Sequence, residues 1–84
     1  MNKEELKKKI IQIADNSKVT GNNLVYAEIP CDEKEAETHW NTMLLCSEYK
    51  RGNKESKSLI GKREYQVFSW SRELGFYNVI LLRI

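Results

Sequence analysis

The side chains best suited to metal binding or nucleophilic chemistry are two cysteines and one histidine, Cys31, Cys46 and His39. Seven residues separate Cys31 from His39 and six separate His39 from Cys46, a spacing that matches no compact zinc-binding pattern. If residues 32–50 form one helix, His39 and Cys46 lie about 10 Å apart along its axis, because each residue adds about 1.5 Å. One ion cannot bridge that separation, so we predict no metal site and interpret both cysteines as structural.

A catalytic thiol or hydroxyl is not expected either. Cys31 precedes a predicted helix start, where the helix dipole lowers a thiol pKa, but the acids of the first turn act in the opposite direction. The serines lie in no nucleophile-elbow motif, and a conventional triad would have to use His39. The four glycines are scattered and form no phosphate-binding loop. We therefore predict a protein that is not an enzyme and that uses no small-molecule cofactor.

A run of basic residues offers a different chemistry, the binding of nucleic acid. Basic side chains in the segment YKRGNKESKSLIGKREY, residues 49–65, can bind phosphates, and Tyr49 and Tyr65 can stack on unpaired bases. Against this, the net charge is only +2, the pI is about 8.6, and no recognition helix or aromatic RNA-binding signature is present. Nucleic-acid binding is therefore the alternative function, through Lys50, Arg51, Lys54, Lys57, Lys62 and Arg63.

These residues must be positioned by a few elements in the order helix, strand, helix, strand, strand. Asn2 is a suitable N-cap for the first helix, and apolar residues then recur at helical spacing. Ser58–Ile60 is a candidate for a short edge strand within a polar connector. The predicted elements are a helix over 2–15, a strand over 24–29, a helix over 32–50, a strand over 63–70, a hairpin loop over 71–75 and a strand over 76–84.

The second helix has coherent end signals. Asp32 and Glu35 form a start that resembles a capping box, and Gly52 lies where a C-cap glycine belongs. A competing interpretation ends the helix near Trp40 and makes residues 42–49 a strand, because short apolar runs fit either structure. In the helical interpretation one stripe is expected to face the core, namely Ala36, Trp40, Met43, Leu44 and Ser47.

The closing segment GFYNVILLRI is apolar on both faces of the predicted strand. Phe76, Ile80, Leu82 and Ile84 share one face, and Tyr77, Val79 and Leu81 share the other, because successive side chains alternate. Such a strand belongs in the interior of a sheet. Either the two helices cover opposite faces, or one face packs against another molecule, and we favour the second arrangement.

The length and composition predict one soluble α+β domain over residues 1–84. Eighty-four residues allow one small core. No stretch has the roughly 18 apolar residues of a spanning helix, and the charged start MNKEELKKK does not resemble a secretory signal. We therefore expect a cytoplasmic protein with reduced cysteines and no membrane partner. The expected fold has the order α-β-α-β-β, an antiparallel C-terminal hairpin and helices packed on the sheet.

The segments LIGKREYQVFSW and YNVILLRI together resemble the C-terminal hairpin of RelE/ParE-type toxins. The resemblance covers under a third of the chain, and the chain opens with a helix where those toxins open with a strand. The resemblance implies that the protein cleaves RNA by means of basic residues and a tyrosine, which would be Lys62, Arg63 and Tyr65. It is the third of the functional hypotheses.

The first hypothesis is a small non-catalytic protein-binding domain with a regulatory or inhibitory role, acting on another protein or on a second copy of itself. Five acidic residues lie within 28–37 and six basic residues within 50–63. This charge asymmetry and the small size of the chain suit a phage or mobile-element protein that acts on a host factor. We expect binding around the hairpin, through Phe68, Trp70, Arg72 and Tyr77. The alternative for the three aromatic residues is that they belong to the core.

Overall fold

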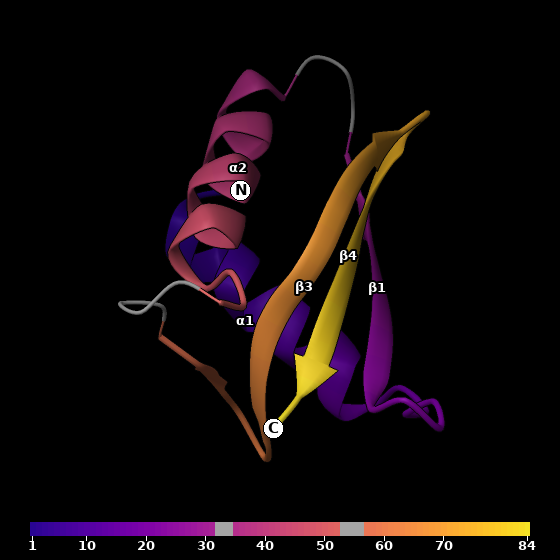
Figure 1. The fold of residues 1–84 in the computed structure, drawn as a ribbon. Helices are drawn as coiled ribbons and strands as arrows, with labels where there is room; N and C mark the ends of the chain where they lie inside the picture. Colours follow the sequence, from indigo (N-terminus) through magenta and orange to yellow (C-terminus); the bar gives the residue numbers. More distant parts are fainter. Residues whose placement is uncertain (32–34, 53–56) are drawn as a thin grey trace.

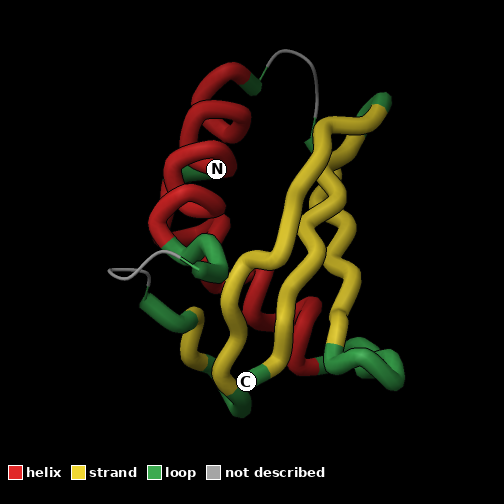
Figure 2. The backbone as a smooth tube through the Cα atoms, in the orientation of Figure 1, coloured by secondary structure: helices red, strands yellow, loops and turns green. Residues whose placement is uncertain are grey.

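A computed structural model of the chain describes residues 1–31, 35–52 and 57–84. Two helices pack on a four-stranded antiparallel sheet in which the strand order is β1-β4-β3-β2 (Figures 1 and 2). The predicted α+β fold is confirmed, with the candidate edge strand as an added fourth strand. The elements are α1 (Lys3–Asp15), β1 (Leu24–Pro30), α2 (Ala36–Glu48), β2 (Leu59–Ile60), β3 (Glu64–Glu73) and β4 (Phe76–Arg83).

Helix α1 forms where its sequence predicts it. The Glu5 backbone N–H donates to Asn2 Oδ1 at 2.9 Å, and the Asn2 side-chain amide donates in return to Glu5 Oε1 at 2.8 Å. This reciprocal cap satisfies one of the free backbone donors of the first turn. The apolar stripe then buries Leu6, Ile10 and Ala14 against the sheet.

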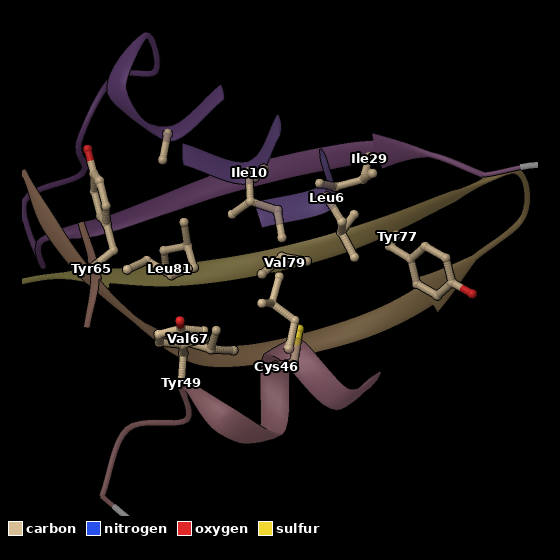
Figure 3. Close-up of a cluster of buried hydrophobic side chains, with 14 of the residues drawn as sticks. Leu6, Ile10, Ile29, Cys46, Tyr49, Tyr65, Val67, Tyr77, Val79 and Leu81 are labelled. Atoms are coloured by element: carbon tan, nitrogen blue, oxygen red, sulfur yellow. The ribbon is translucent and has the colours of Figure 1, made fainter. Parts of the chain in front are cut away.

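Strand β4 lies inside the sheet, with β1 on one side and β3 on the other, as its apolar sequence predicts. Tyr77, Val79 and Leu81 are fully buried, and they share one core with side chains from both helices (Figure 3). Figure 1 shows both helices on the same side of the sheet. The buried residues of every strand therefore point to this covered face, and neither α1 nor α2 lies over the other face, called here the open face.

Residues 42–48 belong to helix α2, which ends at Glu48. The competing interpretation, which made residues 42–49 a strand, is therefore wrong. Helix α2 begins at Ala36, and the expected start at 32–34 lies outside the described residues. The Glu35 side chain makes no capping hydrogen bond, and Tyr49 is the C-cap. Gly52, with φ of 87°, therefore serves a later turn and not the helix end.

The stripe that we expected to face the core points outward instead. Trp40 is 57% exposed and Leu44 is 40% exposed, whereas Thr38 and Thr42 are fully buried on the opposite side of α2. Both threonines are compatible with the core because their hydroxyls are paired. Thr42 Oγ1 donates to the Thr38 carbonyl at 2.6 Å, and Thr38 Oγ1 accepts from the Met1 amino group at 2.8 Å. A buried hydroxyl with a partner carries little cost.

The C-terminal hairpin is tighter than predicted. Strand β3 continues through Glu73, and only Leu74 and Gly75 connect it to β4, in place of a five-residue loop. Gly75 has φ of 84°, a backbone conformation that glycine adopts without strain. A β-bulge between Val67 and Ser69 inserts one extra residue into β3.

The bulge reverses the facing that simple alternation would give to the second half of β3. Trp70 pairs with Val79 of the covered face, and Ser69 pairs with Ile80 of the open face. Simple alternation from Tyr65 would have placed Trp70 on the open face and Ser69 on the covered one. Trp70 is instead half-buried against the core.

The buried hydroxyl of Tyr65 predicts how the fold responds to alkaline pH. Tyr65 donates to Asp15 Oδ1 at 2.9 Å, and burial together with this hydrogen bond raises the pKa of Tyr65 to about 12. The unfolded pKa is about 10, so the stability that the neutral phenol contributes is complete below pH 10 and is lost between about pH 10 and 12.

Denaturant unfolding at successive pH values should therefore show a decline above pH 10 that is shallower in Tyr65→Phe. Part of the decline remains in that variant, because burial also raises the pKa of the Cys46 thiol to about 12 and raises the pKa of Tyr77. Equal slopes for the two proteins would contradict the placement of Tyr65.

Candidate functional site

The open face of the sheet carries an apolar row of four residues from β1 and β4. Tyr26 lies beside Ile80 and Leu24 lies beside Leu82, because β1 and β4 pair in that register. Tyr26 is 50% exposed, and the other three are half-buried. Ile84 follows Leu82 at one end of the row. At the other end Glu28 and Asn78 separate it from Pro30 and Phe76, and Ile60 of β2 lies apart, beside Glu64.

The apolar row has a polar margin along β3. Gln66, Ser69 and Ser71 are the open-face neighbours of Leu82, Ile80 and Asn78. An exposed apolar strip with a polar border is the usual composition of a protein-binding surface. Single exposed apolar residues are common on any protein, but the register here joins them into one strip.

Charges on the strands are fully divided between the two faces of the sheet. The pairing places three exposed carboxylates on the open face, those of Glu28, Glu64 and Glu73. The two arginines of the strands, Arg72 and Arg83, pair with Tyr77 and Tyr65 and so belong to the covered face. The open-face strand positions, all of which the structure describes, therefore carry acids and no base.

The four residues that we predicted for protein binding do not lie on one surface. Tyr77 is fully buried under the helices, and Trp70 packs beside it with their ring centroids 6.2 Å apart. Phe68, at the bulge, is 44% exposed, and the Arg51 guanidinium lies 5.8 Å from its ring centroid. Arg72 is exposed near the hairpin turn.

The open-face residues were not among those predicted, although the sequence carried a signal for them. The alternation within the final strand separates Ile80 and Leu82 from Tyr77. What the sequence did not show is which of the two rows the helices cover. A role in binding for the four residues around the hairpin stays a prediction. The structure directs attention instead to Tyr26, Ile80 and Leu82.

A cavity of about 300 Å³ lies between α2 and β3. The one thiol in its wall is that of Cys46, and burial raises the pKa of this group to about 12. Such a thiol is protonated at neutral pH and is a poor nucleophile. The cavity is lined by Cys46, Ser47, Lys50, Val67, Phe68, Ser69 and Trp70, which together make no catalytic arrangement.

His39 and Tyr77 form a polar contact at the edge of the core. His39 Nδ1 lies 2.5 Å from the Tyr77 hydroxyl, and the two rings stack with centroids 5.8 Å apart. Burial raises the pKa of Tyr77, and a hydrogen bond with Cys31 raises it further. These contacts satisfy the polar end of a buried tyrosine, so we interpret the cluster as structural.

Cys31 and Cys46 are both buried, and neither is part of a disulfide. Among residues 1–31, 35–52 and 57–84, no three acidic, histidine or cysteine side chains are grouped closely enough to bind a metal ion.

The basic residues predicted for nucleic-acid binding are exposed at Lys50, Arg51, Lys57, Lys62 and Arg63, whereas Lys54 lies outside the described residues. The two tyrosines that flank them in sequence are buried, Tyr49 at 6% exposure and Tyr65 at 1%. Neither ring is presented for stacking on a base. The same burial separates Tyr65 from the RNA-cleaving role that the toxin resemblance implies for it.

In the parts of the chain that the structure describes, neither helix has the length and apolar character needed to cross a membrane.

Comparisons with protein-family models, with curated proteins and with solved structures find no match for this chain, so its site is interpreted from its own geometry.

Proposed function

We propose that this chain is a small non-catalytic protein-binding domain that docks a partner on the open face of its sheet. The observation that carries the proposal is the placement of both helices on one face, which leaves an apolar row on the other. Covering that row with a partner removes apolar surface from water, at about 25 cal/mol per Å². A regulatory or inhibitory role agrees with a domain that presents an apolar surface for docking.

The surface of α2 offers a smaller competing patch. Trp40 and Leu44 are exposed one helical turn apart. The open face is favoured because its four apolar residues come from two strands and are joined side by side by strand pairing. Position 40 therefore provides an internal comparison for any binding experiment.

The proposal is tested by photo-crosslinking in the cells that naturally make the protein. A benzophenone amino acid placed at position 80 should yield discrete protein adducts, because that side chain lies in the centre of the open face. The adducts should weaken when Tyr26→Ser is added, since Tyr26 is the β1 neighbour of Ile80. The same probe at position 40 is the matched control.

Nucleic-acid binding is the second candidate function. Arg51 is fixed to β3 by a 2.8 Å hydrogen bond from its backbone N–H to the Val67 carbonyl, and its guanidinium lies over the exposed ring of Phe68. A cation beside an exposed aromatic ring is a suitable contact for a single strand. This site is distinct from the apolar row, so Arg51→Ala and Tyr26→Ser separate the two functions.

A further inference from the structure

We infer that the partner segment on the open face is a basic amphipathic helix of another protein, and not a second copy of this chain. The inference rests on the proposed function and adds the chemistry of the occupant. It is carried by the charge of the open face. All three charged side chains at its strand positions are carboxylates, Glu28, Glu64 and Glu73, although the whole chain has a net charge of +2.

The carboxylates flank the apolar row at both ends. Glu28 and Glu73 lie near the hairpin, because their partners on β4 are Asn78 and Phe76. Ser71 Oγ donates to Glu73 Oε1 at 3.0 Å, which agrees with both side chains lying on the open face. Glu64 lies at the opposite end, where its carbonyl accepts from the Ile84 backbone N–H at 3.0 Å. A complementary partner has apolar residues in the middle and basic residues toward both ends.

The length of the open face along β4 indicates the size of the partner segment. From Phe76 to Ile84 an extended strand spans about 27 Å, at roughly 3.4 Å per residue. A helix of that length has about 18 residues, at 1.5 Å per residue. Helices already cover the other face of this sheet, and a third helix on the open face would complete a layered arrangement that is common in proteins.

The same charges disfavour the other occupants. Two copies docked by their open faces would bring the carboxylates of one face against those of the other with no cation at a strand position, and like charges in an interface oppose association. Nucleic acid and anionic lipid surfaces are also negative, so they would be repelled from this face. A basic protein segment is the occupant that gains from both the apolar row and the carboxylates.

The test uses two synthetic helical peptides of about 18 residues, each with leucines at i, i+3, i+4 spacing. One has lysine at the remaining positions and the other has glutamate. In fluorescence anisotropy the leucine–lysine peptide should bind, more weakly at high salt, and the leucine–glutamate peptide should not. The triple variant Glu28→Gln/Glu64→Gln/Glu73→Gln should bind the lysine peptide about tenfold more weakly.

The matched control is Glu4→Gln/Glu35→Gln/Glu37→Gln, which changes the net charge equally at exposed positions outside the sheet. It should retain the wild-type affinity. If both triple variants bind equally while Tyr26→Ser and Ile80→Ser weaken binding, the open face docks proteins and the inference about charge is overturned. If none of these variants changes binding, the proposed function is overturned as well.

Sedimentation of the free protein completes the test. A concentration-dependent dimer that is lost in Ile80→Ser would show that a second copy occupies the face, which overturns the inference while the docking role stands. A monomer at all concentrations supports it. Binding of a single-stranded oligonucleotide or of anionic vesicles that is lost in Tyr26→Ser would also overturn it.

Discussion

Replacing Leu81 with alanine should lower the free energy of unfolding by about 2–5 kcal/mol, whereas the same change at Leu82 should lower it by roughly 1 kcal/mol or less. The two leucines are neighbours on the central strand. Leu81 is fully buried in the core beneath the helices, and Leu82 is half-buried on the open face. The difference arises because truncation of Leu81 leaves a cavity, while truncation of Leu82 leaves a surface that water can reach.

Urea unfolding of the two variants at low protein concentration measures this difference. The substitutions are chemically identical, so their effects on the unfolded chain are the same and cancel in the comparison. If Leu82→Ala costs as much as Leu81→Ala, both faces of β4 are covered in the free protein. The open face would then be part of the core, and the proposed docking surface would be lost.

Replacing Gly61 with alanine should lower the free energy of unfolding by about 1–3 kcal/mol. A Cβ atom at this position would collide with Ile11 Cγ2 and lie 2.5 Å from Asp15 Oδ2. Asp15 must move to make room, and in doing so it loses two hydrogen bonds. It accepts from the Lys62 backbone N–H at 2.8 Å and from the Tyr65 hydroxyl at 2.9 Å. The buried phenol is then left without its partner.

Two comparisons isolate the cause of this loss. Gly21→Ala is the control, because no atom lies within 4 Å of the added Cβ, and it should change stability by less than about 0.5 kcal/mol. In a Tyr65→Phe background the penalty of Gly61→Ala should shrink, since the hydrogen bond to Asp15 is already absent. A penalty at Gly61 equal to that at Gly21 would contradict the close approach of β2 to α1.

The parts of the fold that the sequence predicted are those in which local and tertiary signals agree. Helix α1 has its cap at Asn2 and its apolar stripe on the buried side. Strand β4 is apolar on both faces and lies inside the sheet. In both elements the residues that favour the local structure are also the residues that the core requires.

The parts that differed depend on contacts that no local pattern reveals. Burial of Thr38 and Thr42 on α2 requires hydroxyl partners, one of which comes from the distant Met1. Without that knowledge, the more hydrophobic stripe containing Trp40 was the better prediction for the core. Propensity and hydrophobicity indicate which residues can be buried, and the tertiary packing decides which are.

The candidate site was missed because no local pattern shows which face of the sheet the helices cover. The β-bulge adds to this, since one inserted residue between Val67 and Ser69 reverses the facing that simple alternation gives Trp70. The hairpin loop was overestimated for a related reason, since Ser71 and Glu73 are polar yet continue the strand on its open side. A polar residue on an uncovered face looks like a loop residue in sequence.

Photo-crosslinking from position 80 in the native cell tests the docking surface most directly, since that side chain lies in the apolar row on β4, beside Tyr26 of β1. We predict discrete protein adducts from position 80 that Tyr26→Ser weakens and that a probe at position 40 does not reproduce. Adducts that are equal from both positions, or unchanged by Tyr26→Ser, would contradict a partner on the open face.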